Sequence, residues 1–201
     1  MLLNIAVFAS GRGSNFEALC KSISEKKINA RVVIVLSNNS DAGALLLARS
    51  FHIPAFHISQ KQFPSTEIFT QHILDTLERY AVNVIVLAGY MKKIDAKIIQ
   101  RYRNHIINIH PALLPKFGGA GMYGHFVHEA VIAANEKFSG ATVHIVDEEY
   151  DKGAILLQQK IAVDANDTAE TLAQKVLNIE HEILPRVIEM IAEGTITLGH
   201  L

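Results

Sequence analysis

Residues 5–19 read IAVFASGRGSNFEAL and predict a strand, a glycine-rich turn and a helix in direct succession. Residues 5–9 are a short apolar run, residues 10–15 carry two glycines, and the residues from Phe16 onward begin a helical pattern. A strand that passes through such a turn into a helix is the repeating unit of α/β folds. We therefore expect the same alternation further along the chain.

The first half of the chain repeats this alternation. Short apolar or β-branched runs predict strands at residues 31–36, 53–57, 84–88 and 105–109. Helical spacing, or a capping residue such as Asp95, predicts helices at residues 42–51 and 66–80 and directly after residue 95. We expect a single-domain α/β fold with a mainly parallel, Rossmann-like sheet flanked by helices.

In the second half of the chain, strands no longer alternate with helices. Residues 141–146 and 154–163 are both strand-like, but only residues 147–153 separate them. This connection is too short for the crossover that a parallel pair needs. We therefore expect an antiparallel strand pair in the C-terminal half of the chain.

The last helical pattern covers residues 168–192. Asp167 or Thr168 can cap its start, and Gly194 can end it. Pro185 lies inside the pattern and removes one backbone hydrogen bond, so a kink or break is expected near this residue.

Composition limits the class of protein. The chain has 201 residues, a hydrophobic fraction of 49% and a net charge of −1, which favour one globular domain and argue against nucleic-acid or membrane-surface binding. Its apolar runs are too short to span a bilayer, and residues 1–8 fit a first strand better than a signal peptide. The single Cys20 is expected to be a packing residue. These features fit a cytoplasmic protein.

The turn at residues 10–15 can bind an anion. Two glycines before a helix start can aim backbone N–H groups at a ligand, and Ser14 and Asn15 add side-chain donors. Phe16 stands where the dinucleotide fingerprint requires a third glycine, so we interpret the turn as a site for one phosphate around Gly13, Ser14 and Asn15. The structural alternative is a tight turn with Ser14 as the helix cap.

A second polar group follows the strand at residues 105–109. Asn108 and His110 are two residues apart, so on an extended strand their side chains point the same way, and Pro111 then ends the strand. An amide and a protonated imidazole can both donate to a developing oxyanion, and the Asp151 carboxylate can raise the pKa of the imidazole and keep it charged. Taken singly, each of these residues also fits a structural role.

The ten histidines raise the question of a metal site. Neither a His-Glu-x-x-His pattern nor a cysteine cluster is present in the sequence. His125 and His128 are three residues apart, and we interpret them as part of a solvated helix start rather than as ligands. We expect no metal.

Several separated motifs together resemble the folate-dependent formyltransferases. They are Asn-x-His-Pro-x-Leu-Leu-Pro at 108–115, Thr-Val-His-x-Val at 142–146 and Asp-x-Gly at 151–153. One branch of this family, which acts in purine synthesis, has the most similar motifs. They correspond to the glycine turn, residues 87–91 and residues 179–181 of this chain. The resemblance implies one domain over 1–201, with a nucleotide-phosphate half at about 1–100 and a folate and catalytic half at about 101–201.

The resemblance also implies a reaction and a set of site residues. The amine of glycinamide ribonucleotide would attack the formyl carbon of the co-substrate 10-formyltetrahydrofolate, without a metal, a nucleic-acid partner, a membrane or a covalent enzyme adduct. The protein would be a monomer or a homodimer, and His144 would lie beside the catalytic residues. The implied residues are Asn108, His110 and Asp151 for catalysis, Gly13, Ser14 and Asn15 for the phosphate, Glu180 for the nucleotide, and Met91, Lys92, Lys93, Ile94 and Asn108 for folate.

Three details of the resemblance stay open. The family often has arginine where this chain has Thr66 and Lys92, and lysine keeps the charge but loses the planar fork of arginine. Residues 116–124 contain four glycines and form either a mobile loop over the site or merely a long surface loop.

Two rival functions are considered. Methionyl-tRNA formyltransferase or formyltetrahydrofolate hydrolase would need a further domain, for which 201 residues leave no room. A nucleotide-binding sensor without catalytic activity is the other rival. The intact set of Asn108, His110 and Asp151 argues against it.

Overall fold

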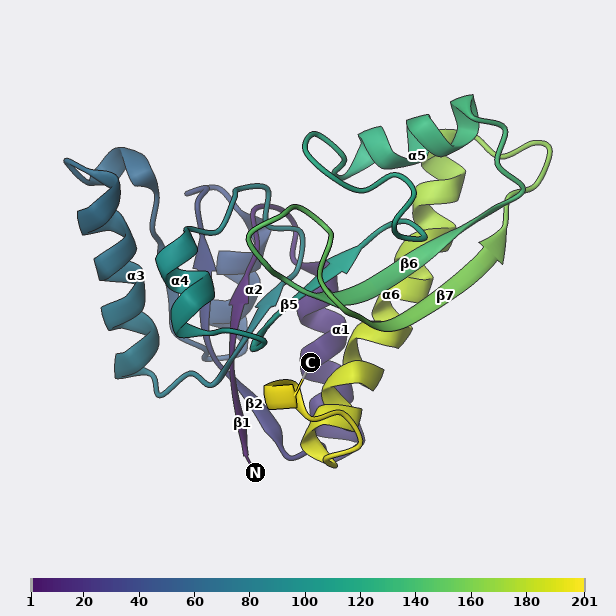
Figure 1. The fold of residues 1–201 in the computed structure, drawn as a ribbon. Coiled ribbons are helices and arrows are strands. Elements are labelled where there is room, and N and C mark those ends of the chain that lie inside the picture. The colour runs from purple at the N-terminus through teal and green to yellow at the C-terminus, as the bar shows by residue number, and fades with distance from the viewer. Residues whose placement is uncertain (1, 201) are drawn as a thin grey trace.

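The computed structural model describes residues 2–200, which contain a single seven-stranded sheet in the order β3-β2-β1-β4-β5-β6-β7 (Figure 1). The first five strands in this order pair in parallel, and the last two pairings, β5 with β6 and β6 with β7, are antiparallel. The strands are β1 (Leu3–Phe8), β2 (Ala30–Ser37), β3 (Ala55–His57), β4 (Val84–Leu87), β5 (Ile106–His110), β6 (Phe138–Ile145) and β7 (Ile155–Ala162).

Helices cover both faces of this sheet. The α-helices are α1 (Ser14–Glu25), α2 (Gly43–Ser50), α3 (Thr66–Arg79), α4 (Ala96–Arg101), α5 (His125–Ala133) and α6 (Ala169–Ala192), and the short 3₁₀ helices are η1 (Gln60–Gln62) and η2 (Leu198–His200). Helices α3 and α4 lie on one side, and α1 and α6 lie on the other (Figure 1). The expected single-domain α/β class, with its antiparallel pair in the second half, is confirmed.

Each face of the sheet packs against a hydrophobic core of its own, which explains why the central strands are continuously apolar. In β1, Ile5 and Val7 face the core shared with α1, α2 and α6, whereas Ala6 and Phe8 face the core shared with α3 and α4. Successive side chains of a strand point to opposite faces, so a strand covered on both faces must be apolar at every position. The run at residues 84–87 alternates between the two cores in the same way.

The expected ends of the last helix are confirmed; of the expected kink or break at Pro185, the break is wrong. Thr168 caps α6 by accepting a hydrogen bond from the backbone of Thr171, and Gly194 follows the helix with a positive φ of 80°. The helix continues without interruption through Pro185. Pro185 and its apolar neighbours on α6 are buried against the core, and this packing outweighs the loss of one backbone hydrogen bond.

Two element boundaries also differ from expectation. Strand β6 begins at residue 138 rather than 141 and includes Gly140, where a Cβ would lie 2.0 Å from the backbone oxygen of Gln159 on β7. Helix α1 begins at Ser14 rather than Phe16, and Gly13 is its N-cap residue. The alternative in which Ser14 caps the helix is therefore wrong.

Thr142 anchors the segment that leaves β5. Its buried hydroxyl donates to the carbonyl of Ala112 over 2.6 Å and accepts from the backbone N–H of Leu114 over 3.2 Å and from Gln158 over 2.8 Å. In the β5–β6 ladder Thr142 pairs with His110. The hydroxyl therefore fixes the path of the chain immediately after a candidate catalytic residue.

We expect Thr142→Val to lower the free energy of unfolding by about 1–3 kcal/mol, because it leaves a buried carbonyl and two buried donors without this partner. Urea denaturation of the variant and the parent protein measures the change. The matched control is Thr76→Val, whose hydroxyl bonds only the carbonyl of His72 in its own helix, and its cost should be under about 1 kcal/mol. Equal costs for the two variants would contradict a special role of Thr142.

Candidate functional site

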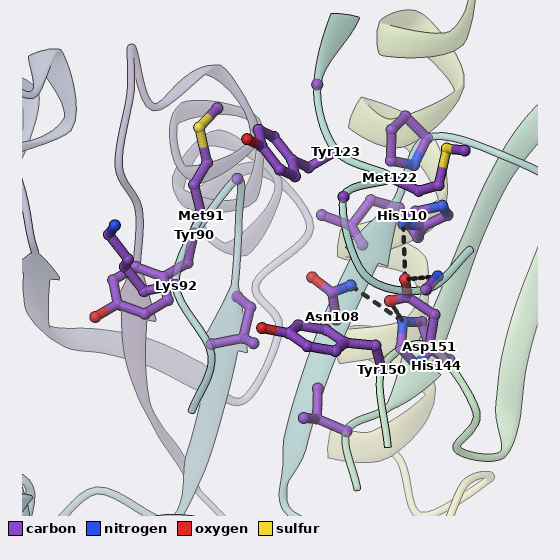
Figure 2. Close-up of a pocket in the computed structure, with 18 of the residues that line it drawn as sticks. Tyr90, Met91, Lys92, Asn108, His110, Met122, Tyr123, His144, Tyr150 and Asp151 are labelled. Atoms are coloured by element: carbon purple, nitrogen blue, oxygen red, sulfur yellow. Dashed lines mark hydrogen bonds and ion pairs between the residues drawn. The ribbon is translucent and has the colours of Figure 1, made fainter. Parts of the chain in front are cut away.

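A cavity of about 660 Å³ opens at the carboxyl ends of β4 and β5. Its walls come from residues 89–94 after β4, residues 119–124 before α5, residues 146–151 after β6, and one side of α6. Figure 2 shows side chains from these segments converging on the same space. Ligands of parallel α/β proteins commonly bind at the carboxyl ends of the strands.

Asn108, His110 and Asp151 all line this cavity. Asn108 and His110 lie on the same side of β5, as their spacing predicts, and Asp151 comes from the turn after β6 (Figure 2). The Asp151 Oδ2 atom lies 3.8 Å from His110 Nδ1 and accepts a hydrogen bond of 2.8 Å from the backbone N–H of Gly119. The structure thus brings these three predicted residues together at the end of β5.

The electrostatics of His110 differ from expectation. Its side chain is buried, and its Nε2 atom lies 2.8 Å from the carbonyl oxygen of Phe117. Burial lowers the pKa of His110, and the Asp151 carboxylate and the Phe117 carbonyl oppose that shift without cancelling it. Asp151 raises the pKa of His110, as expected, but removal from water costs the charged imidazole more than the carboxylate returns, so the net shift is downward.

His144 connects two members of the trio. Its Nδ1 atom lies 2.8 Å from the carbonyl oxygen of Ile145, while its Nε2 atom lies 3.1 Å from the Asn108 amide nitrogen and 3.4 Å from Asp151 Oδ1. A carbonyl oxygen can only accept, so Nδ1 carries a proton. The expected place of His144 beside the trio is found, and its ring nitrogen is shared between an amide and a carboxylate.

The Asp151 carboxylate is stabilised as an anion. Burial raises the pKa of Asp151, but the hydrogen bonds and positive potential of His144, His110 and the Gly119 N–H lower it more, so the net shift is downward. Asp151 itself has a positive φ of 56°, which is uncommon for a residue with a side chain. The chain thus adopts a strained turn to hold a charged carboxylate against two imidazoles.

The other end of the cavity contains a buried carboxyl group. Glu180 on α6 accepts a 2.6 Å hydrogen bond from the side-chain amide of Asn15, and both residues line the cavity. Burial raises the pKa of Glu180 to about 7, with the Asn15 bond opposing the shift. The amide oxygen of Asn15 is buried without a partner. The Glu180 carboxyl group therefore keeps unused acceptor capacity at this end.

The glycine turn borders this end of the cavity only in part. Of its predicted phosphate-binding residues, Asn15 lines the cavity, whereas Gly13 and Ser14 lie beside it at the start of α1. Gly13 has a φ of 88°, and a Cβ there would lie 2.9 Å from Cα of Ala44. Because Gly13 has no side chain, the first turn of α1 has no side-chain cap, and its backbone N–H groups are available to an anion.

The predicted folate residues Met91, Lys92, Lys93 and Ile94 all line the cavity. Ser10 holds this segment against the glycine turn, because its N–H donates to Gly89 O over 3.0 Å and its hydroxyl accepts from the Met91 N–H over 2.9 Å. Thr66 stands where relatives often have an arginine. It is the first residue of α3 and does not line the cavity.

Three cavity-lining residues were missed or misread from the sequence. His128 was interpreted as solvated, but it is 5% exposed, and burial and the nearby His125 and His110 lower its pKa to about 4. Tyr123 and Tyr150 also line the cavity, and the sequence does not single them out within the loop at 116–124 and the segment 146–151, parts of which the family resemblance implies for folate. The available signal was weak: one tyrosine adjoins a glycine-rich loop and the other precedes Asp151.

The loop at residues 116–124 covers the site, as one of its two interpretations requires. Gly119, Met122 and Tyr123 line the cavity, and the Phe117 carbonyl contacts His110. A Cβ at Gly118 would lie 2.6 Å from a Leu114 methyl carbon, so the loop is closely packed where it passes the trio. Its mobility stays a prediction.

Among the side chains of residues 2–199, no three His, Cys, Asp or Glu residues are grouped so as to hold a metal ion. Nor is any helix of this part of the chain long and apolar enough to cross a membrane.

The chain is similar to known proteins over nearly its whole length. It is 43% identical over 96% of its residues to the chloroplastic phosphoribosylglycinamide formyltransferase of Arabidopsis thaliana, but spans only 66% of that relative. It is 39% identical to the phosphoribosylglycinamide formyltransferase of Bacillus subtilis, with 92% of this chain and 93% of the relative covered. The crystal structure of glycinamide ribonucleotide transformylase 1 from Symbiobacterium toebii superposes with a TM-score of 0.90 at 35% identity, covering 96% of this chain and 89% of that one. Residues 3–188 match the formyl transferase family, and the chain belongs to that family.

Proposed function

We propose that this protein transfers the formyl group of 10-formyltetrahydrofolate to the amine of glycinamide ribonucleotide, a step of purine (IMP) synthesis. The observation that carries the proposal is the single cavity that joins Asn108, His110 and Asp151 to the Asn15–Glu180 pair on one side and to residues 91–94 on the other. Relatives named for this reaction cover most of the chain. A cytoplasmic location and a monomeric or homodimeric state stay predictions.

The nucleotide is proposed to bind at the end formed by α1 and α6. Its phosphate would accept hydrogen bonds from the uncapped first turn of α1 at Gly13, Ser14 and Asn15. Glu180 would accept from polar groups of the nucleotide. In this proposal the first half of the chain supplies the phosphate site, and the second half supplies the catalytic groups. Glu180 belongs to the second half but would contact the nucleotide.

The folate is proposed to bind at the opposite end, against residues 91–94. The half-exposed Met91 side chain offers apolar surface there, and Lys92 and Lys93 offer positive charge to the carboxylates of a folate. Asn108 lines the same cavity and would contact the formyl group. In this arrangement the formyl carbon would lie beside the amine that attacks it.

The trio is proposed to stabilise the tetrahedral intermediate. Attack of the amine turns the formyl oxygen into an oxyanion, to which Asn108 and His110 donate hydrogen bonds. His110 Nε2–H donates to the Phe117 carbonyl and orients the ring, and the 3.8 Å between Nδ1 and Asp151 is too long for a hydrogen bond. A proton on Nδ1 is therefore free to bond the oxyanion. The protonated imidazole then gives its proton to the departing folate nitrogen as the C–N bond breaks, and the resulting neutral imidazole takes up the proton that the attacking amine loses.

His144 is proposed to set the orientation of the Asn108 amide. The His144 Nε2 atom lies 3.1 Å from the Asn108 amide nitrogen and can accept from one of its two N–H groups. This contact would fix the plane of the amide and leave the second N–H to donate to the oxyanion. His144 thus acts as a positioning residue.

The first prediction tests the reaction itself. The purified protein mixed with glycinamide ribonucleotide and 10-formyltetrahydrofolate should convert both substrates, as followed by the folate absorbance and by the formylated nucleotide. Omission of the nucleotide should stop folate conversion, which separates transfer from hydrolysis. Asn108→Ala should lower kcat by about 10²–10³ because an oxyanion donor is lost. No transfer at saturating substrates would refute the proposed function.

The second prediction concerns pH. Asp151→Asn removes the carboxylate that raises the pKa of His110, so that pKa should fall further below its ordinary value. The charged imidazole is lost as pH rises through this pKa, so the alkaline limb of kcat that reports His110 should move to lower pH. Kinetics across pH 5–9 measure the shift. The control Asp164→Asn removes a surface carboxylate paired with Lys175 and should leave the alkaline limb of the pH profile where it is. An equal shift of this limb in both variants, or no shift in Asp151→Asn, would contradict the role of Asp151.

The third prediction concerns His144. His144→Leu should lower kcat by about 10-fold or more, since Asn108 loses the partner that orients its donor. His144→Gln keeps a side chain that can donate to Asp151 and should retain more activity than the leucine variant. Substrate binding should change less than kcat in both. Thermal unfolding identifies any general loss of structure, and wild-type kcat in the leucine variant would exclude the positioning role.

A further inference from the structure

A second cavity adjoins the loop that covers the trio. It has a volume of about 250 Å³ and lies between the segment after β5, helix α5 and the start of β6. Its apolar walls come from Leu113, Phe117, Val131 and Phe138. None of the residues that line it also lines the cavity that contains the trio, which is called the first cavity below. The second cavity is therefore separate from the proposed substrate sites.

One polar group in the wall of the second cavity has no partner. Ser139 on β6 lines the cavity and is only 2% exposed, and its hydroxyl makes no hydrogen bond within residues 2–199. A buried hydroxyl without a hydrogen bond costs free energy. A hydroxyl can both donate and accept, so Ser139 favours a ligand that carries one hydrogen-bonding group.

The charges in the wall of the second cavity cancel each other. Its charged residues are Lys116 and Glu136, and their side chains form an ion pair of 2.7 Å. A charged ligand would have to give up its own hydration without an unpaired opposite charge to receive it. The cavity therefore favours a neutral molecule. Lys116 and Phe138 are exposed and mark the side from which such a molecule can enter.

The volume of the second cavity fits a single aromatic ring. An apolar cavity of about 150 Å³ can hold benzene, so this cavity has space for a ring with a small substituent. Phe117 and Phe138 offer aromatic surface against which such a ring can pack. The size, the neutral wall and the unpaired Ser139 hydroxyl together describe a phenol, which has a flat apolar body and one hydroxyl group.

Phe117 connects the second cavity to the trio. Its side chain lines the second cavity, while its carbonyl oxygen lies 2.8 Å from His110 Nε2. Phe117 has a positive φ of 55°, a conformation that a residue with a side chain keeps only where its surroundings hold it. The packing of the Phe117 ring therefore affects where its carbonyl points, and through the carbonyl it affects the His110 ring.

We propose that the second cavity is a binding site for small neutral phenols, and that Phe117 transmits its occupancy to His110. A phenol packed against the Phe117 ring would hold this residue in its observed conformation and keep its carbonyl on His110 Nε2. The hydroxyl of the ligand would bond Ser139. Binding at this site does not depend on the proposed function, whereas any effect of the ligand on turnover does.

Three probes of similar size test the class of ligand. Phenol, toluene and benzoate are titrated separately into the full-length protein, and NMR of the ligand signals gives each Kd. Phenol should bind with a Kd on the order of 1 mM, and benzoate more weakly because it must bury a charge. Ser139→Ala should raise the Kd of phenol by about 3- to 10-fold, because one hydrogen bond is lost. The same variant should leave the Kd of toluene unchanged, because toluene has no hydroxyl.

Thr70 provides the matched control. It lies on α3, it is 1% exposed, its hydroxyl also lacks a partner within residues 2–199, and it lines neither cavity. Thr70→Val should therefore leave the Kd of phenol unchanged. Ser139→Ala should unfold at the same urea concentration as the parent protein, because the hydroxyl that it removes makes no bond within the fold.

NMR of isotope-labelled histidine tests the connection to His110. Saturating phenol should slow the exchange of the His110 Nε2 proton with water by about 2-fold or more, because the carbonyl that accepts this proton is held more firmly. Phe117→Leu keeps the backbone carbonyl but removes the ring. In this variant saturating phenol should leave the exchange rate unchanged. Phenol should also leave the KM of both proposed substrates unchanged, since the two cavities share no lining residue.

Several results would overturn the inference. The parent protein could fail to bind phenol at about 10 mM, or phenol could raise the KM of a substrate, which would place it in the first cavity. Equal weakening of phenol and toluene by Ser139→Ala, or tighter binding of benzoate than of phenol, would exclude the proposed class of ligand. Bound phenol without an effect on the His110 proton would remove the connection through Phe117. A parent protein that binds phenol as expected but transfers no formyl group would refute the proposed function and leave this site standing.

Discussion

The antiparallel pairing of β5 with β6 is the constraint on which the site depends. It places Asn108 opposite His144 and His110 opposite Thr142. Alternate residues of a strand share a face, so a slip of one residue would turn Asn108 and His110 away from the cavity together. The same pairing fixes where β6 ends and therefore where the turn bearing Asp151 begins. The buried hydroxyl of Thr142 adds a second constraint, because it bonds the chain directly after His110.

The balance of burial and charge at His110 has a mechanistic consequence. Burial disfavours the charged imidazole, and Asp151 offsets only part of that cost. In the proposed reaction an oxyanion forms next to this ring and adds a second negative neighbour. The charged form would then be favoured most when the intermediate is present. Stabilisation that is stronger in the transition state than in the ground state is what accelerates a reaction.

The sequence was sufficient for the features that depend on local periodicity. The continuous apolar run at 84–88 predicts a strand buried on both faces, and the two-residue spacing of Asn108 and His110 predicts a shared side. Features that depend on tertiary packing were missed. Pro185 does not break α6, because the buried face of that helix holds it against the core. In the sequence His128 reads as a solvated residue, because its burial depends on the tertiary contacts around the cavity.

Ser10 shows how the fold relates the two ends of the cavity. It stands after β1, and its backbone and hydroxyl bond residues 89 and 91 after β4, while the hydroxyl also donates to Asn38 after β2. Three neighbouring parallel strands are thus tied together at their carboxyl ends by one small side chain. The glycine turn begins at Ser10, and the predicted folate segment begins at Met91. Because both start from the same hydrogen-bonded point, their separation is set by the sheet rather than by flexible loops. Two substrates bound at these ends would therefore meet at a fixed distance, which is the requirement for direct transfer between them.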